Sequence, residues 1–403
     1  MHVLESYALQ NDLKIDKAVV YEKYFPLAVD KFITIDTSNL GTSSLAYDHW
    51  QLVVDLIHPQ LEEEGIKIIQ LGDKNCTPLH QCYITLGQCN FNQRAYILGK
   101  SLMHVCPNNE SSHVASHYNK KSIVLFSNNC YLSQFSPYWT DRPTLDQFKR
   151  GESRAELLQP PIHKRPSFNP SENPKSINSI KPEVVADKIL KQLDIHTFVP
   201  EFETVKIGSS FHRPRTESTL THLLDAKKFG VSSLIIRMDL NFNEEVLRKQ
   251  LESCECSIIT NRPLSDEILN KYHKKIVELV YYIEDDNDPS FIKKVKEKSM
   301  TYLLRSNKDE EQTNDFKLDY MDYGLVNQMP TRSQGDFEEL KGLENLYYKS
   351  THFIIHNNKF YPSTAAYLRN TQGSPSMQHD PYPVIDDPLF WGEEEHFHFL
   401  VKK

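Results

Sequence analysis

The chain has 403 residues, of which 39% are hydrophobic and 25% are charged, and its formal net charge at pH 7 is −8. This composition is that of a globular protein, and at about 150 residues per domain the length predicts two domains or three. The negative charge excludes a broad nucleic-acid surface, and the absence of a signal-type or ~20-residue apolar stretch predicts a cytoplasmic protein with no transmembrane segment.

Strands and helices are expected to alternate in the first half of the chain. Apolar runs predict strands at 32–36, 66–71, 102–106 and 122–126, and apolar residues at spacings of three and four predict helices at 47–64 and 92–98. A short helix is expected to end at Tyr118. Such alternation predicts an α/β fold with a parallel sheet, whose ligands bind at the carboxyl ends of the strands. We therefore expect the loops 37–44, 72–75 and 107–113 to converge there.

A change in composition separates this region from the second half. Residues 150–182 are rich in Pro, Ser, Asn and Lys, which predicts a linker or an irregular wrap, and the apolar periodicity of 182–193 predicts the helix that closes a first domain at 1–195. A second α/β domain is expected at 200–330. Its first strand is predicted at 204–208, its first helix at 219–229, and further strands at 233–238, 256–260, 277–283 and 301–305. Residues 331–403 are expected to be an irregular aromatic and acidic extension that ends in the alternating strand HFHFLV.

The segment NNESSH, residues 108–113, lies between a predicted strand and a predicted helix. Hydroxyls and amides at such a helix start can hold a diphosphate, so Ser111, Ser112 and His113 are candidate phosphate ligands and Glu110 a candidate partner of a sugar hydroxyl. The alternative is structural: Asn109 or Ser111 caps the helix, and His113 is a satisfied polar residue on a buried helix.

The two neighbouring loops supply further candidates for the same ligand. Ser43 and Ser44 can help to hold phosphates, although Ser and Thr before a helix commonly act as caps. Gly72 permits close approach of a nucleoside and Asp73 can accept from ribose hydroxyls, with an ordinary turn as the alternative.

In the second half, the segment IGSSFHRPRTEST stands out after the predicted strand 204–208. Arg213 and Arg215 are candidates for binding phosphate or an acceptor, and His212 and Glu217 are candidate bases. Asp239, which leaves the strand 233–238, is a third candidate base. The alternative is a solvated charged loop followed by a capped helix.

The cysteines and the terminal histidines do not predict a metal site. Cys254 and Cys256 lack a second pair with zinc-ligand spacing, and the seven cysteines fit reduced thiols better than a disulfide framework. His396 and His398 alternate in the last predicted strand and are expected to pack against it. The sequence also contains no Walker loop, G-x-S-x-G elbow or protein-kinase signature.

The motif order of residues 30–195 resembles the donor-binding domain of glycosyltransferase family 9, the ADP-heptose:lipopolysaccharide heptosyltransferases. The helix YDHWQLVVDLIHPQL, the strand GIKIIQLG, and the run NQRAYILGKSLMHVCPNNESSHVAS followed by the strand KSIVLFS carry this resemblance. The family's phosphate loop usually reads N-D-S/T-G-x-x-H-x-A, and here the sequence is N-E-S-S-H-V-A. Leu45 lies where a donor-binding lysine is expected.

The resemblance implies a two-Rossmann (GT-B) glycosyltransferase of lipopolysaccharide or other glycan biosynthesis. Such an enzyme moves a sugar from a nucleotide-diphosphate donor to an acceptor hydroxyl on a glycan or another molecule, by inversion and with no metal or other cofactor. Two alternatives stay open at this point. The chain is either a non-catalytic nucleotide- or glycan-binding protein with the same fold, or a protein whose second domain holds the chemistry.

Overall fold

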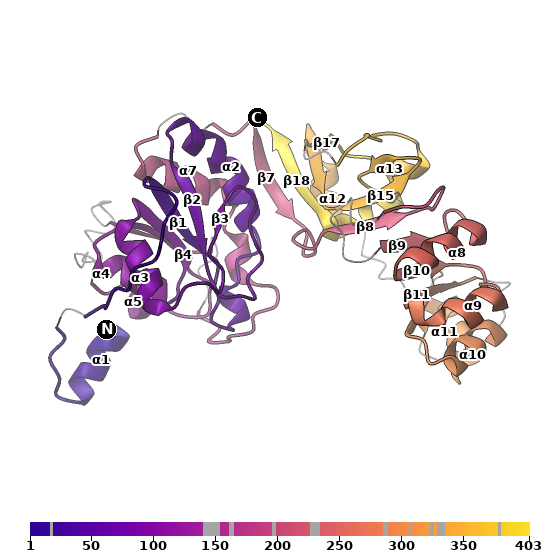
Figure 1. Cartoon of the computed structure of the whole chain (residues 1–403), viewed down its shortest axis with the longest axis horizontal. Coiled ribbons are helices and arrows are strands. Elements are labelled where there is room, and N and C mark those ends of the chain that lie inside the picture. The colour runs from indigo at the N-terminus through magenta and orange to yellow at the C-terminus, as the bar shows by residue number, and fades with distance from the viewer. Residues whose placement is uncertain are drawn as a thin grey trace. The chain divides into compact units, whose positions relative to one another are not determined.

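The computed structural model describes two compact units, Met1–Pro200 (unit 1) and Glu201–Lys403 (unit 2), each considered separately (Figure 1). The residues described are all except 17–18, 140–153, 161–164, 196–198, 226–233, 285–288, 307, 309, 323–325, 329–334 and 378–379. None of the helices in the described part of the chain is long and apolar enough to cross a membrane.

The described strands of unit 1 form a six-stranded parallel sheet in the order β3-β2-β1-β4-β5-β6. The strands are β1 (Phe32–Asp36), β2 (Lys67–Leu71), β3 (Tyr83–Ile84), β4 (Met103–Pro107), β5 (Lys121–Leu125) and β6 (Ala155–Leu158). The chain runs outward from β1 to one edge and then returns to β4, on the other side of β1. The strand order therefore reverses between β1 and β4, which is the topological switch point of a doubly wound sheet.

Helices cover both faces of this sheet (Figure 1). On one face α2 (Trp50–Glu63) and α7 (Pro182–Gln192) pack together on the sheet through apolar residues such as Val53, Ile57 and Ile189. On the other face lie α3 (Phe91–Lys100) and α4 (Glu110–His117), with Ala95, Leu98 and Val114 in the core. The shorter helices of the unit are α1 (Val3–Gln10), η1 (Ser43–Leu45), α5 (Leu132–Phe135) and η2 (Ser176–Ser179).

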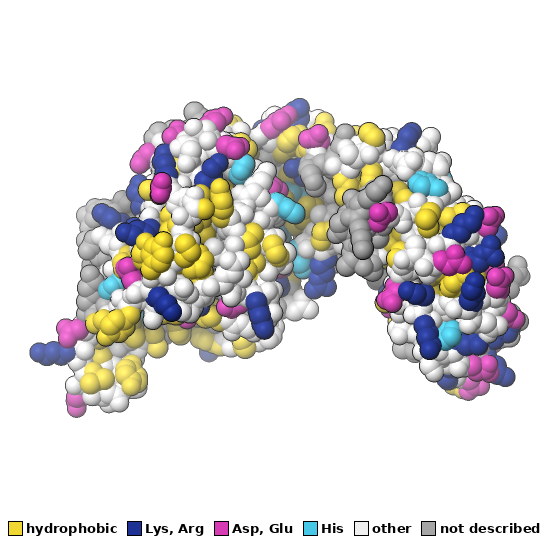
Figure 2. All heavy atoms as spheres, in the orientation of Figure 1, with side chains coloured by type: hydrophobic (Ala, Val, Ile, Leu, Met, Phe, Trp, Pro, Cys, Tyr) yellow, Lys and Arg dark blue, Asp and Glu magenta, His cyan; other side chains and the backbone are white. Residues whose placement is uncertain are grey.

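The N-terminal helix was not expected from the sequence. His2 caps α1 by accepting from the Leu4 amide, and its Nε2 lies 2.9 Å from the Ser136 carbonyl, which ties the helix to the body of unit 1. Figure 2 shows hydrophobic side chains gathered over this helix, and Tyr7 and Leu9 are among the exposed ones. A helix whose apolar residues face outward lacks the periodic buried stripe by which helices are identified from sequence.

The remaining elements predicted for unit 1 are confirmed to within a few residues. Strands 32–36, 66–71, 102–106 and 122–126 correspond to β1, β2, β4 and β5, and the predicted helices correspond to α2, α3, α4 and α7. One boundary changes the interpretation of the site: α4 begins at Glu110, so the last four residues of NNESSH are the first turn of a helix rather than a loop. The expected linker at 150–182 contains β6, which pairs with β5, although residues 150–153 and 161–164 lie outside the described part of the chain.

Unit 2 contains a second, mainly parallel sheet in the order β13-β12-β11-β10-β9-β8-β15-β16. Its strands are β8 (Arg215–Ser218), β9 (Leu234–Arg237), β10 (Cys256–Thr260), β11 (Ile276–Ile283), β12 (Tyr302–Ser306), β13 (Val326–Gln328), β15 (His352–His356) and the antiparallel β16 (Lys359–Tyr361). The α/β class with two Rossmann-like parallel sheets, expected from the sequence, is thus confirmed. Because β8 to β13 follow one another in a single direction, right-handed crossovers place their connecting helices on one face.

That face is where the largest core of unit 2 lies. The connecting helices are α8 (Glu244–Ser253), α9 (Asp266–Tyr272) with η4 (His273–Lys275), α10 (Pro289–Glu297) and α11 (Glu310–Asp319). Alternate strand residues such as Ile236, Ile258 and Tyr281 point into this core, and Leu251 and Ile292 of the helices meet them. The strand residues between them, among them Arg237 and Tyr282, belong to the opposite and less buried face.

The expectation that residues 331–403 form an irregular extension is wrong. They contain α12 (Gly335–Lys341), β14 (Leu346–Ser350), β15, β16, α13 (Thr364–Leu368), β17 (Tyr382–Pro383), α14 (Pro388–Trp391), η5 (Glu394–His396) and β18 (Phe397–Lys402). An antiparallel sheet in the order β17-β14-β18-β7 packs its aromatic residues, among them Tyr348, Phe390, Trp391 and Phe397, into a separate core. The abundance of aromatic residues in this segment reflects that core.

Two further expectations for unit 2 need correction. The predicted strand 204–208 is β7 (Phe202–Ile207), but it pairs antiparallel with β18 instead of opening the parallel sheet. The predicted loop after it contains β8, and residues 219–225 of the predicted helix 219–229 are not helical, whereas 226–229 lie outside the described residues. The charged sequence RTES did not predict a buried strand. The strand is possible because Arg237, which is distant in sequence, compensates the charge of Glu217.

Candidate functional site

The switch point of unit 1 brings together the loops that follow β1 and β4. The Asn109 side chain joins them, because its Nδ2 donates to the Ser38 carbonyl oxygen over 3.1 Å. The loop after β2 adjoins the loop after β1, since a Cβ placed on Gly72 would lie 3.3 Å from Thr37 Oγ1. The predicted convergence of the three strand-end loops is therefore confirmed.

A chain of buried hydrogen bonds runs behind these loops. His104 of β4 lies with Nδ1 2.9 Å from Thr34 Oγ1 and Nε2 2.8 Å from Ser111 Oγ. Ser111 Oγ donates to Asn109 Oδ1 over 2.6 Å, and Asn109 also accepts from the Ser111 amide. These bonds are all satisfied if Thr34 donates to His104 and His104 donates to Ser111. Burial lowers the pKa of His104 to about 4, so its ring is neutral at neutral pH.

The chain of bonds ends at Asp36, the last residue of β1, whose side chain is fully buried. Its Oδ1 accepts from the amide of Ser38 over 2.9 Å and from the Ser38 hydroxyl. Its Oδ2 is buried and has no hydrogen-bond partner among the described residues. A buried carboxylate oxygen left unsatisfied costs about 1–3 kcal/mol or more, so this atom is an unusual buried acceptor at the switch point.

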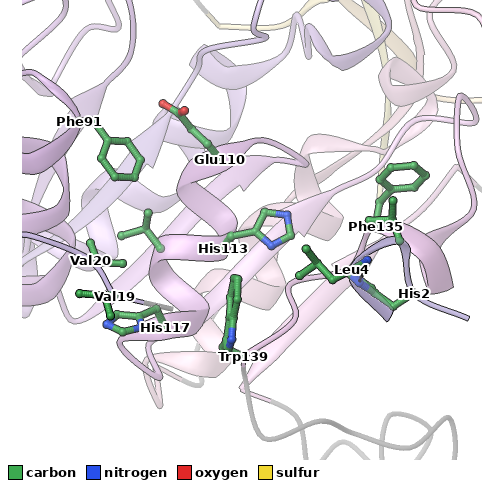
Figure 3. Close-up of a pocket in the computed structure, with 12 residues that line it drawn as sticks. His2, Leu4, Val19, Val20, Phe91, Glu110, His113, His117, Phe135 and Trp139 are labelled. Carbon is green, nitrogen blue, oxygen red and sulfur yellow. Dashed lines mark hydrogen bonds between the residues drawn. The ribbon is translucent and has the colours of Figure 1, made fainter. Parts of the chain in front are cut away.

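A cavity of about 490 Å³ lies beside α4, on its side away from the sheet (Figure 3). Glu110, His113 and His117 of α4 line it, together with Phe91, Trp139 and several apolar side chains. The His113 ring points into the cavity toward Trp139, and the two ring centroids are 6.5 Å apart. Burial, with a smaller contribution from His2, lowers the pKa of His113 to about 4, which makes it a neutral group in an apolar wall.

The four candidates from NNESSH therefore have different surroundings. Ser111 bonds to Asn109 and His104, and the Ser112 hydroxyl donates to the Asn109 carbonyl oxygen over 2.7 Å. Both serines are buried, as the capping alternative expects. Glu110 is paired with Arg94 of α3 at 2.8 Å, and with His113 it faces the cavity. A role for these residues in binding phosphate stays a prediction.

The other candidates of unit 1 lie in the two neighbouring loops. Ser44 is buried and its hydroxyl accepts from Asn129 Nδ2 over 3.0 Å, whereas Ser43 donates to the Pro170 carbonyl oxygen over 3.3 Å. Gly72 has a φ of +148° and close neighbours on two sides, so the backbone requires glycine there. Asp73 is exposed, and its carbonyl oxygen accepts from the Cys76 amide in a turn.

In unit 2, Glu217 lies inside a charged network rather than in a solvated loop. Its Oε1 accepts from Arg215 over 2.7 Å, its Oε2 from Arg237 over 2.6 Å, and His352 Nε2 is 3.3 Å from Oε2. Burial raises the pKa of Glu217, but the basic side chains beside it outweigh burial and hold the pKa well below its usual range. The second base candidate, Asp239, accepts two hydrogen bonds from the Arg237 guanidinium, from Nε over 2.9 Å and from Nη2 over 2.8 Å.

The remaining candidates, His212 and Arg213, lie before β8. Arg213 is exposed and its Nε donates to His212 Nε2 over 3.2 Å. Arg215, the first residue of β8, bonds to Glu217 and thereby belongs to the charged network. Within the described residues, no group of three or more His, Cys, Asp or Glu side chains is arranged to hold a metal ion.

Sequence reasoning missed Asp36, His104 and Arg237, which shape the two sites. Asp36 could have been found, because it ends an apolar strand and precedes a loop of small polar residues. His104 lies within an apolar run with no polar neighbour in sequence, and its partners Thr34 and Ser111 become evident only from the pairing of β1 with β4.

Comparisons with known proteins match the chain only at the level of structure. No protein-family model and no curated protein matches the sequence. Among solved structures, a family 9 glycosyltransferase from Veillonella parvula aligns at 10% identity and a TM-score of 0.31, over 40% of this chain and 46% of that one. The ADP-heptose LPS heptosyltransferase II of E. coli aligns at 16% identity and a TM-score of 0.30, over 47% and 50%.

A third solved structure, the dodecameric iron-containing heptosyltransferase TibC in complex with ADP-D-beta-D-heptose, aligns at 13% identity and a TM-score of 0.28, over 42% and 46%. The chain thus spans about half the length of the solved proteins that it matches. Likeness at this level does not establish a shared family or a shared activity.

Proposed function

We propose that the protein is a glycosyltransferase whose unit 1 binds the nucleotide-diphosphate donor at the switch point between β1 and β4. The observation that carries this proposal is the joined pair of loops at that point, with the buried acceptor Asp36 Oδ2 behind them and the cavity beside α4 next to them. Ligands of doubly wound sheets bind at this place. The resemblance of N-E-S-S-H-V-A to the family 9 phosphate loop supports a diphosphate as the ligand.

The parts of a nucleotide sugar match different parts of this region. A diphosphate is favoured beside the first turn of α4, where the helix dipole is positive, and the largely apolar cavity with His113 and Trp139 suits a flat nucleobase. Glu110, which lines the cavity, is an acceptor for ribose or sugar hydroxyls. In this arrangement the helix amides stabilise the leaving diphosphate, and we propose an inverting transfer without a metal.

The base that takes the acceptor's proton has to come from a carboxylate or an imidazole. Of the three candidates, Asp239 fits best, because it follows the carboxyl end of β9, where ligands of parallel sheets bind. Glu217 fits poorly, since a carboxylate held by three basic side chains is a weak proton acceptor.

A second function is a non-catalytic nucleotide- or glycan-binding protein. The observation in its favour is that both carboxylate candidates, Glu217 and Asp239, form ion pairs with Arg237. The two functions differ in whether a bound nucleotide sugar is consumed.

The test of donor binding is thermal unfolding of the full chain with ADP, UDP, GDP and CDP. A nucleotide at 100 times its dissociation constant adds about 2.7 kcal/mol to the free energy of unfolding. At about 2–4 °C per kcal/mol for a unit of this size, that corresponds to a rise of roughly 5–11 °C in Tm. No rise with any of the four nucleotides would contradict the proposal.

Matched serine variants locate the bound nucleotide. Ser111→Ala removes a buried hydroxyl at the start of α4, and Ser101→Ala removes a buried hydroxyl that donates to the Leu98 carbonyl oxygen at the end of α3. Both changes remove a buried, hydrogen-bonded hydroxyl, although Ser111 loses bonds to both Asn109 and His104, and only Ser111→Ala is expected to weaken nucleotide binding. Equal affinities for the two variants would place the nucleotide elsewhere. A product assay with the bound nucleotide sugar then distinguishes the two functions. An enzyme releases or transfers the sugar, whereas a binding protein leaves the nucleotide sugar intact.

A further inference from the structure

A second cavity, of about 460 Å³, lies in unit 2 between the β15–β16 hairpin and the end of α13. His356, Asn357 and Lys359 line it from the hairpin, and Tyr367 and Asn370 line it from α13 and the residues after it. His356 is the last residue of the parallel strand β15, so the cavity is at the carboxyl edge of the sheet. This is the edge at which parallel sheets bind ligands.

The side chains around this cavity are mostly aromatic rings and uncharged polar groups, with one lysine and one leucine. Tyr361 and Tyr367 meet edge to face with ring centroids 5.7 Å apart, and His356 lies 5.2 Å from Tyr367. Asn370 Oδ1 accepts from the Tyr361 hydroxyl over 2.9 Å, which fixes the amide at the wall. No carboxylate is among the described lining residues, and Lys359 is the one cation among them.

The hydrogen bonds of His356 fix which of its nitrogens is an acceptor. The Thr219 hydroxyl donates to the Ile355 carbonyl oxygen over 3.4 Å, and its oxygen lies 2.7 Å from His356 Nδ1. The hydroxyl oxygen is therefore an acceptor for Nδ1, which carries the proton. Asn357 Nδ2 donates to Nε2 over 3.0 Å. Burial lowers the pKa of His356, which keeps the ring neutral at neutral pH. A ligand hydroxyl that replaces the Asn357 amide finds an acceptor at Nε2.

These groups match a sugar better than a phosphate or an acyl chain. A pyranose presents an apolar face of C–H bonds, which suits a tyrosine ring, and a rim of hydroxyls that both donate and accept. Amides, a phenol and a neutral imidazole bond to such hydroxyls in both directions. A phosphate needs more positive charge than one lysine supplies, and an acyl chain leaves the two amides unsatisfied.

We propose that this cavity binds one sugar residue of a glycan, and that this glycan is the acceptor of the transfer reaction. Only the second part rests on the proposed function. Hydrogen bonds link the cavity to the loop that carries the candidate base Asp239, because Thr219, which bonds to His356, also accepts from Asn241 Nδ2 over 2.7 Å. The residues that recognise the acceptor are then His356, Asn357, Lys359, Tyr367 and Asn370.

The test is an array of neutral and acidic oligosaccharides, probed with the full chain without nucleotide, followed by calorimetry with the best glycan. Tyr367→Ala is expected to weaken binding about tenfold or more, as loss of a stacking and hydrogen-bonding partner does. Lys359→Ala is expected to weaken it about threefold. The matched control is Arg369→Ala, a neighbouring exposed cation that pairs with Asp387 and does not line the cavity.

A second variant, which fills the cavity, tests the proposal even if Tyr367→Ala does not fold. Leu368 lines the cavity and is 55% exposed, so Leu368→Trp is expected to fold and to block the sugar. The proposal is overturned if no oligosaccharide binds, or if binding survives both Leu368→Trp and Lys359→Ala. Because no nucleotide is present, failure here leaves the donor proposal standing, and absence of nucleotide binding leaves the sugar cavity standing.

Discussion

Replacing Glu217 by glutamine distinguishes a structural role of the charged network from a catalytic one. The side chain is 1% exposed and bonds to Arg215 and Arg237, with His352 at 3.3 Å. Glutamine preserves the shape and one acceptor but removes the negative charge. The Arg237 side chain, which is 11% exposed, then keeps only Asp239 as its counter-charge.

The expected loss of stability follows from this burial. Removing one partner from a buried ion pair typically costs about 3–5 kcal/mol. Because Arg237 retains Asp239 and Arg215 is 38% exposed to water, we expect a value near the lower end, about 3 kcal/mol. For a unit of this size, this loss corresponds to a fall in the Tm of unit 2 of roughly 6–12 °C.

Differential scanning calorimetry at pH 7 measures this fall, with Glu245→Gln as the control. Glu245 pairs with Lys249 at the surface and is 70% exposed, so its replacement is expected to leave Tm unchanged. The pKa of Glu217 lies below its unfolded value of about 4.3, so its contribution is present above that pH and is lost as the pH falls through the folded pKa. If Glu217→Gln keeps the Tm of the wild type but abolishes sugar transfer, the structural account is refuted.

Three further predictions concern unit 1. The folded pKa of His104, about 4, lies below the usual 6.5, so the stability it confers is full above pH 6.5 and falls toward pH 4; His104→Asn should flatten the dependence of Tm on pH over that range. Asn109→Ala removes the cap of α4 and the bond to Ser38, and should cost about 1–2 kcal/mol in urea unfolding. Gly72→Ala places a Cβ 3.0 Å from Cys76 Sγ at a φ of +148°, and should cost about 1–3 kcal/mol, more than Gly65→Ala, where nothing lies within 4 Å.

Four strands of each parallel sheet were predictable because each is a local pattern, whereas others, such as β6 and β8, were missed. The strand 256–260 is a short apolar run between polar segments, and the structure places β10 at the same residues. The rule that ligand loops meet at the carboxyl ends of strands also predicted that residues 37–44 and 107–113 lie together, as the bond between Asn109 and Ser38 confirms. Pairing partners were not predictable, since β7 and β18 are separated by most of unit 2 and neither sequence specifies the other.

The charged residues show why the site could be predicted only in part. The sequence predicted loops or strand ends at Arg215, Glu217 and Arg237. Charged residues in such places are usually exposed to solvent. In the structure β8 lies between β9 and β15, which brings Arg237 and His352 to the two sides of Glu217. The charge of Glu217 is therefore compensated by residues 20 and 135 positions away in the sequence. A buried carboxylate of this kind becomes distinguishable from a surface one only when the order of the strands is known.

The two cavities differ in the chemistry of the side chains that line them, and this difference predicts different ligands. The cavity beside α4 is lined mainly by Trp139 and apolar residues, with Glu110 and histidines among them, whereas the cavity at the end of β15 is lined mainly by tyrosines and amides, with one lysine. An apolar wall with a neutral imidazole favours a flat, weakly polar group, and a wall of amides and phenols favours a ring of hydroxyls. A transferase that joins a nucleotide-bound sugar to a glycan needs one site of each kind. The chemistry of the two walls thus supports the proposed assignment of donor to unit 1 and acceptor to unit 2, and exchange of the two ligand specificities in the binding experiments would contradict it.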